Sequence, residues 1–268
     1  MPTAAARLTA EPPAIASPSA LLALTEVPRA LAELGALRFA SAVLATAPRG
    51  DGHPVLVVPG FIASDGSTAL LRRYLTQMGY DAHAWGLGRN LGPRAIGPEG
   101  EKLIDRLLSI HASTGQKVSI VGWSLGGIMA RVIARRAPDA VRQVITLGSP
   151  FAGDPRATNV WRAYELLTGQ RIASASTQSQ LAEAAGPPSV RSTAIYSRKD
   201  GIVAWQVCRD DPDAVTDNIE VHGSHIGLAV NASVYYAIAD RLAQSEDDWR
   251  PFDRSGAKSL VYPATGHA

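Results

Sequence analysis

The sequence has a single cysteine, almost no net charge and no long uninterrupted apolar segment. Cys208 has no second cysteine to pair with, so the chain cannot form an internal disulfide, and it fits a reducing compartment. We therefore expect a cytoplasmic protein. The formal net charge is +2, and the basic residues are scattered among acidic ones without a basic stripe or interleaved aromatics. This pattern argues against nucleic acid as a partner.

The first 44 residues show no segment suited to a membrane. Residues 1–17 are rich in Ala, Pro and Thr and are predicted to be a flexible N-terminal arm. Residues 18–44 have a helical pattern but contain four charged side chains, namely Glu26, Arg29, Glu33 and Arg38. These charges are too many for a membrane span or for the apolar core of a secretory signal. We predict an amphipathic helix packed on the domain and no stable insertion into a membrane.

Short apolar runs alternate with helix-forming segments through the rest of the chain. Six of these runs are predicted strands, at about 53–58, 80–85, 117–121, 141–147, 191–197 and 218–222. Strands that alternate with helices are typical of a mostly parallel sheet covered on both faces. We therefore predict an α/β fold, with residues 18–268 forming a single domain that is long enough for a substantial core.

Ser124 is the predicted nucleophile. It is the centre of Gly122-Trp123-Ser124-Leu125-Gly126, which lies between a β-branched run and a helix-forming run. A serine at a strand-to-helix elbow takes strained backbone angles, and side chains at Gly122 and Gly126 would crowd the neighbouring strand and helix. The elbow exposes the Ser124 hydroxyl at the positive end of the following helix, which favours developing negative charge.

A serine nucleophile needs a base and an acid that orients the base. Asp200 follows a predicted strand in a Lys-Asp-Gly turn, and His225 follows the next strand after Gly-Ser, so we predict that they are the acid and the base. The order serine, acid, histidine is that of the α/β-hydrolase fold. Asp154 remains a rival acid and His222 a rival base. Because His222 and His225 lack a third metal-ligating neighbour, we predict neither a metal site nor a cofactor.

Two further groups of residues complete the predicted site. The backbone amides of Phe61, after Pro59-Gly60, and of Leu125 are the predicted donors of an oxyanion hole. Residues 152–190 form a long connection with two predicted short helices, which we expect to lie as a small cap above Ser124. Five apolar side chains on turns near this edge are predicted to bind the acyl or alkyl group: Ile62, Trp85, Trp123, Ile202 and Trp205.

Five motifs together resemble the bacterial lipase and esterase branch of the α/β-hydrolase superfamily, over roughly residues 50–245. They are GWSLGG, the PGF turn, LGSPFAG, YSRKDGIVAW and GSHIGLAV. The resemblance implies the same nucleophile, acid, base and oxyanion donors as the residue patterns. The sequence departs from many relatives at Pro59, where they have histidine; this affects the expected pocket shape but not the backbone donors.

The sequence therefore predicts a serine esterase that acts through an acyl-enzyme on a small-molecule carboxylic ester. Two alternatives remain open at this point. An acyltransferase of the same fold would pass the acyl group to an alcohol or an amine, and a noncatalytic binding protein would use the fold without its chemistry. Cys208 lacks any motif that would make it a competing nucleophile.

Overall fold

The computed structural model describes residues 15–154 and 156–264. Its sheet has six strands, all parallel, in the order β2-β1-β3-β4-β5-β6. The strands are β1 (Pro54–Val58), β2 (Asp81–Ala84), β3 (Val118–Trp123), β4 (Val141–Leu147), β5 (Arg191–Tyr196) and β6 (Thr216–Glu220). Each predicted strand is confirmed, although β6 begins and ends two residues earlier than expected.

The order of the strands marks where a ligand would bind. The chain passes from β1 outward to β2 and then returns to the other side of β1 to form β3. In open α/β sheets, ligands bind beyond the carboxyl ends of the strands at such a reversal. Phe61 follows β1 and Ser124 follows β3, so the two segments predicted to be functional flank this reversal.

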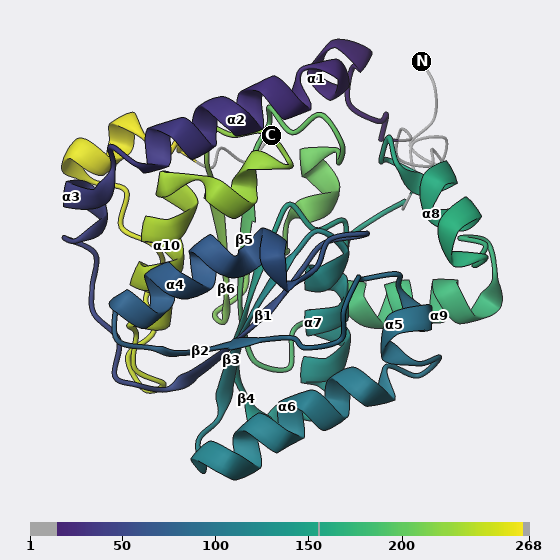
Figure 1. The fold of residues 1–268 in the computed structure, drawn as a ribbon, viewed down its shortest axis with the longest axis horizontal. Helices are drawn as coiled ribbons and strands as arrows, with labels where there is room; N and C mark the ends of the chain where they lie inside the picture. Colours follow the sequence, from purple (N-terminus) through teal and green to yellow (C-terminus); the bar gives the residue numbers. More distant parts are fainter. Residues whose placement is uncertain (1–14, 155, 265–268) are drawn as a thin grey trace, which may run out of the picture.

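Helices cover both faces of the sheet, as predicted (Figure 1). One face packs against α4 (Ala69–Gln77) and α10 (Ala232–Leu242), and the other against α6 (Glu101–Thr114) and α7 (Leu125–Arg136). Successive side chains of a strand point to opposite faces. Val57 accordingly packs with Ile238 in one core, whereas its neighbour Leu56 packs with Leu107 in the other. The continuous apolar runs of the sequence reflect burial on both sides.

The predicted helix over residues 18–44 forms three separate helices on the sheet face that α10 covers. They are α1 (Ala20–Leu24), α2 (Glu26–Leu37) and α3 (Ser41–Leu44). Pro28 explains the first break, because its ring would clash with the carbonyl of residue 24 in a continuous helix, whereas it is tolerated in the first turn of α2. Residues 1–14 of the predicted arm lie outside the described residues, and Ile15 packs beside Val207.

The two helices predicted between β4 and β5 are α8 (Trp161–Thr168) and α9 (Ala175–Ala185). The end of α9 is attached to α7 through Arg131, a buried residue that donates to the carbonyl oxygens of Ala184 (2.6 Å) and Gly186 (3.1 Å). Arg131 also pairs with buried Asp210 at 2.8 Å, so its charge is compensated. In the part of the chain that the structure describes, no helix is both long and apolar enough to cross a membrane.

Candidate active site

Ser124 occupies the sharp elbow between β3 and α7. Its backbone angles are φ 54° and ψ −120°, and positive φ is unfavourable for a residue with a side chain. The Ser124 amide donates to the Leu147 carbonyl at the end of β4, at 2.8 Å, which helps to hold the turn. The strain predicted at this residue is therefore present and is supported by the adjacent strand.

The two glycines that flank Ser124 are required by close backbone contacts. A Cβ atom at Gly126 would lie 2.5 Å from the carbonyl oxygen of Val58, and one at Gly122 would collide with the carbonyl oxygen of Gly126. The crowding predicted from the sequence motif is confirmed. Glycine at both positions lets β1, β3 and α7 approach closely enough to form the elbow.

The three side chains predicted as nucleophile, base and acid form one chain of hydrogen bonds. Ser124 Oγ lies 3.0 Å from His225 Nε2, and His225 Nδ1 lies 2.6 Å from Asp200 Oδ2. Because an ionised carboxylate only accepts hydrogen bonds, His225 Nδ1 carries the proton and Nε2 is left to accept from the Ser124 hydroxyl. All three side chains are buried, so bulk water competes little for these contacts.

Asp200 is held in place by the turn that follows it. Its Oδ1 accepts from the backbone amides of Ile202 (2.8 Å) and Val203 (2.7 Å), which leaves Oδ2 for His225. The Trp123 indole adds a contact on the other side of the base, because its Nε1 donates to the His225 carbonyl at 3.1 Å. Both ends of the His225–Asp200 contact are therefore fixed.

The environment of His225 contains opposing influences on its pKa. Burial alone lowers the pKa of an imidazole, because it disfavours the charged form. The Asp200 carboxylate, through charge and hydrogen bonding, and the Glu26 carboxylate, through charge, outweigh burial and raise the pKa of His225. The imidazole thus becomes a better proton acceptor than an isolated one.

The rival residues lie elsewhere. Asp154 is exposed and accepts from the backbone of Arg156 within its own turn. His222 is exposed, and its carbonyl rather than its ring contacts Asn231. Cys208 is fully buried, and burial raises the pKa of its thiol well above the usual range, which makes the thiolate form unfavourable.

The turn after β1 passes close to Ser124, because a Cβ atom at Gly60 would lie 3.3 Å from the Ser124 Cβ. Among the hydrogen bonds within residues 15–154 and 156–264, none uses the amide of Phe61 or of Leu125 as donor. Buried Asn90 fixes this turn: its side chain donates to the Pro59 carbonyl, its carbonyl accepts from the Ile62 amide, and its own amide donates to Ala63, each at 2.8 Å. Sequence reasoning missed Asn90, although an asparagine within a glycine-rich loop is a common turn stabiliser.

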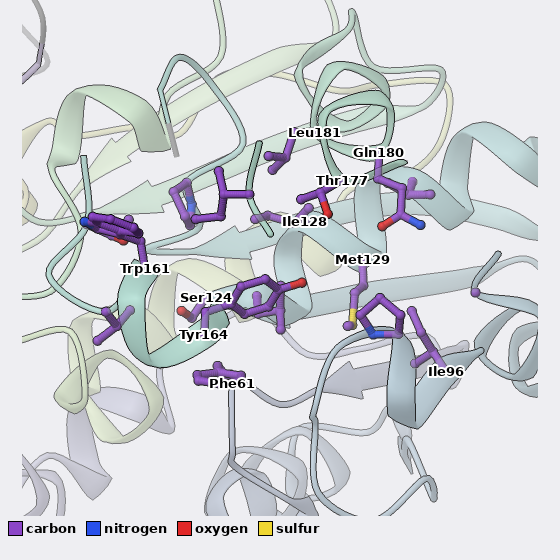
Figure 2. A pocket seen from close by; sticks show the side chains of 18 of the residues that line it. Phe61, Ile96, Ser124, Ile128, Met129, Trp161, Tyr164, Thr177, Gln180 and Leu181 are labelled. Atoms are coloured by element: carbon purple, nitrogen blue, oxygen red, sulfur yellow. The ribbon is translucent and has the colours of Figure 1, made fainter. Parts of the chain in front are cut away.

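A mostly apolar cavity of about 120 Å³ lies beside Ser124. Its walls come from α5 (Pro93–Ile96), α7, α8 and α9, and Figure 2 shows Leu181 and Thr177 facing α7 across it. Phe61 and Tyr164 close one side, with ring centroids 5.4 Å apart. The connection predicted as a cap thus forms part of the cavity wall.

Two comparisons of the sequence show which known proteins the chain is similar to. Residues 101–232 match the model of the PGAP1-like alpha/beta domain family. Over 124 residues the chain is 30% identical to a triacylglycerol lipase of Burkholderia plantarii, covering 42% of this chain and 34% of that lipase. The chain therefore aligns with about a third of the length of this curated relative.

Solved structures show the same fold. Lipase B of Aspergillus fumigatus superposes with a TM-score of 0.55 at 19% identity, covering 75% of this chain and 55% of that one. The mature lipase BlEst2 of Bacillus licheniformis gives 0.53 at 19% identity, covering 74% and 95%. The chain therefore has the α/β-hydrolase fold, and part of its sequence is similar to a lipase. The residues predicted as nucleophile, acid and base all lie within the segment that matches the family model.

The side chains predicted to bind the acyl group do not line this cavity. Trp85 is fully buried in the core beside α6, with its Nε1 donating to the Gly88 carbonyl. Ile62 is half exposed at the rim, with a positive φ of 57° that is unusual for a β-branched residue. The strain at Ile62 belongs to the turn that Asn90 holds.

The other three side chains predicted for the pocket also lie outside the lining of this cavity. Trp123 packs beside His225, with ring centroids 6.1 Å apart. Ile202 packs in a cluster with Val203 and Cys208, and Trp205 stacks on Tyr196 at 5.8 Å. The sequence placed these residues near the edge of the sheet that carries Ser124, but their side chains pack against neighbouring loops. The cavity is lined by α7, α8 and α9 instead.

The raised pKa of His225 can be tested directly by NMR titration of its ring. We expect a midpoint above the usual value of about 6.5. In the Asp200→Asn variant the burial effect prevails, so the midpoint should fall below that of the native protein. His225→Gln identifies the resonance by its absence. A native midpoint at or below 6.5 would contradict the electrostatic balance described here.

Proposed function

We propose that this α/β hydrolase cleaves carboxylic esters through an acyl-enzyme on Ser124. The observation that carries the proposal is the hydrogen-bonded chain from Ser124 through His225 to Asp200, at the start of α7 and beside an apolar cavity. A nucleophile with a base in reach, and an acid orienting that base, is the arrangement that serine-dependent acyl transfer needs. The similarity to lipases supports the same class of substrate.

Acylation begins with a proton transfer. His225 Nε2 accepts the proton of the Ser124 hydroxyl while Oγ attacks the ester carbonyl carbon, and Asp200 stabilises the resulting imidazolium. The tetrahedral intermediate then collapses, and His225 returns the proton to the departing alkoxide, which leaves as an alcohol. Protonation of Nε2 in advance removes the base, so activity is lost as the pH falls through the raised pKa of His225.

Negative charge on the carbonyl oxygen requires donors that are already in place. The amides of Phe61 and Leu125 are suited to this role because they use no protein acceptor among the described residues and lie beside Ser124. The positive end of the α7 dipole also stabilises negative charge on this oxygen. Asn90 supports the arrangement by keeping the Phe61 turn rigid.

Deacylation repeats these steps with water as the nucleophile. His225 Nε2 takes a proton from water while the oxygen of that water adds to the acyl carbon. The tetrahedral intermediate then collapses with cleavage of the bond to Oγ, and His225 returns the proton to Oγ, which regenerates Ser124 and releases the carboxylic acid. The cavity beside Ser124 is mostly apolar, which favours an apolar acyl group. We accordingly propose esters with an apolar acyl group as substrates.

The proposal predicts a sharp contrast between matched variants. Ser124→Ala and His225→Gln should each lower kcat/KM for p-nitrophenyl butyrate by about 10³-fold or more, because each removes a member of the chain of hydrogen bonds. His222→Gln and Asp154→Asn alter the rival residues and should stay within about twofold of the native rate. Full turnover in folded Ser124→Ala protein would contradict the proposal.

The cavity predicts the preference for acyl length. Leu181 of α9 faces the cavity (Figure 2), so Leu181→Ala should enlarge it and raise the ratio of octanoate to butyrate ester hydrolysis by about tenfold. Leu166→Ala on α8 changes a leucine that is 84% exposed and serves as the control, with an unchanged ratio. An unchanged ratio in Leu181→Ala would show that the acyl group binds elsewhere.

A further inference from the structure

Helix α2 turns its acidic side chains inward and leaves apolar ones in water. Glu26 is only 2% exposed and Glu33 is partly buried, whereas Val27 and Leu31 on the same helix are 59% and 64% exposed. Burying a carboxylate is unfavourable unless donors surround it. The inward orientation therefore implies that these carboxylates make contacts that the fold needs.

Glu26 accepts hydrogen bonds from two separate loops. Its Oε1 accepts from the backbone amides of Gly201 (2.8 Å) and His225 (3.0 Å), and its Oε2 accepts from the Ile226 amide (2.9 Å). Arg29, one turn further along α2, pairs with Oε1 at 2.9 Å. All four partners are N–H donors, so both oxygens act as acceptors, as in an ionised carboxylate.

These contacts join the two loops that carry the acid and the base. Gly201 directly follows Asp200, and Ile226 directly follows His225. The Arg29 guanidinium extends the connection, because it donates to the carbonyl of Lys199 at 2.7 Å. The Glu26 carboxylate thus joins two loops that are also linked by the Asp200–His225 side-chain contact and by Ser197, whose hydroxyl donates to the Gly223 carbonyl at 2.7 Å.

We propose that Glu26 is a positioning residue for the ester hydrolysis described above: it holds the Asp200 and His225 loops together so that His225 stays directed at Ser124. The inference rests on the proposed function and extends it to a residue outside the segment that matches the family model, residues 101–232. Glu26 touches neither Ser124 nor the cavity, so it acts through His225 and not on the substrate.

The charge of Glu26 also acts on His225. The charged and titratable groups around the imidazole are Asp200, with Cys208 behind it, and, from α2, Glu26 with its partner Arg29. Glu33 of α2 binds the neighbouring Ser224 amide and hydroxyl, each at 2.8 Å. Of the two acidic residues of α2, Glu26 contributes to the raised pKa of His225. Replacing Glu26 and replacing Glu33 should therefore have different effects on that pKa.

The test compares Glu26→Gln with Glu33→Gln. Both substitutions neutralise a carboxylate of α2 that accepts from the base loop, so both remove similar contacts. The titration midpoint of the His225 ring is followed by NMR, and kcat/KM for p-nitrophenyl butyrate is measured well above that midpoint. For Glu26→Gln we expect the midpoint to fall by about half a pH unit and kcat/KM to fall about tenfold. For Glu33→Gln we expect an unchanged midpoint.

The outcomes separate this inference from the proposed function. An unchanged midpoint or a native kcat/KM in Glu26→Gln, or an equal midpoint shift in both variants, overturns the role of Glu26 while Ser124-dependent hydrolysis stands. Conversely, a midpoint that falls only in Glu26→Gln, in a protein without esterase activity, supports the contact between Glu26 and the base and overturns the proposed function.

If Glu26→Gln does not fold, Arg29→Gln provides a second test of the proposal. Arg29→Gln removes the cation that partly neutralises Glu26, so the proposal expects the His225 midpoint to rise above the native value. A midpoint that is unchanged or lower in Arg29→Gln overturns the proposal. Because Arg29 is partly exposed, its replacement leaves less buried polar surface unsatisfied than Glu26→Gln does.

Discussion

The short contact between His225 Nδ1 and Asp200 Oδ2 is the interaction on which the other features of the site depend. It fixes the proton on Nδ1, and only then is Nε2 free to accept from Ser124. It also opposes the effect of burial on the imidazole, which would otherwise lower its pKa. A site this well shielded from water could not retain a useful base without a carboxylate beside it.

The fold brings these groups together by placing each after the end of a parallel strand. Ser124 follows β3, Asp200 follows β5 and His225 follows β6, so all three reach the same edge of the sheet. The sheet alone does not set their distances to within the tolerance of a hydrogen bond. That precision comes from local supports: the Leu147 carbonyl at the elbow, the amides after Asp200, and the carboxylate of Glu26.

The parts of this account that follow from the sequence are those with a local signature. Short apolar runs that alternate with helix-forming segments predicted all six strands, and the glycines around Ser124 predicted an elbow because their lack of a side chain is a local steric requirement. Asp200 and His225 could be predicted because each follows a strand in a turn. Their place at the shared edge of the sheet follows from these positions.

The remaining features depend on contacts between distant segments. Trp85 and Trp205 were assigned to the pocket by their position after strands, but packing against the core and against Tyr196 decides where their side chains lie. Asn90 acts on a turn about thirty residues earlier in the chain, and Glu26 acts on loops nearly two hundred residues later. Residue types and spacing give no indication of such partners, because neither periodicity nor local propensity depends on them.

The most direct test of the account is to trap its covalent intermediate. The protein is mixed with p-nitrophenyl butyrate, quenched in acid during turnover, digested and analysed by mass spectrometry. We expect one butyryl group on the peptide that contains Ser124, absent when the protein is denatured before mixing. A butyryl group on a different residue, or release of acid with no acylated peptide under conditions that slow deacylation, would contradict it.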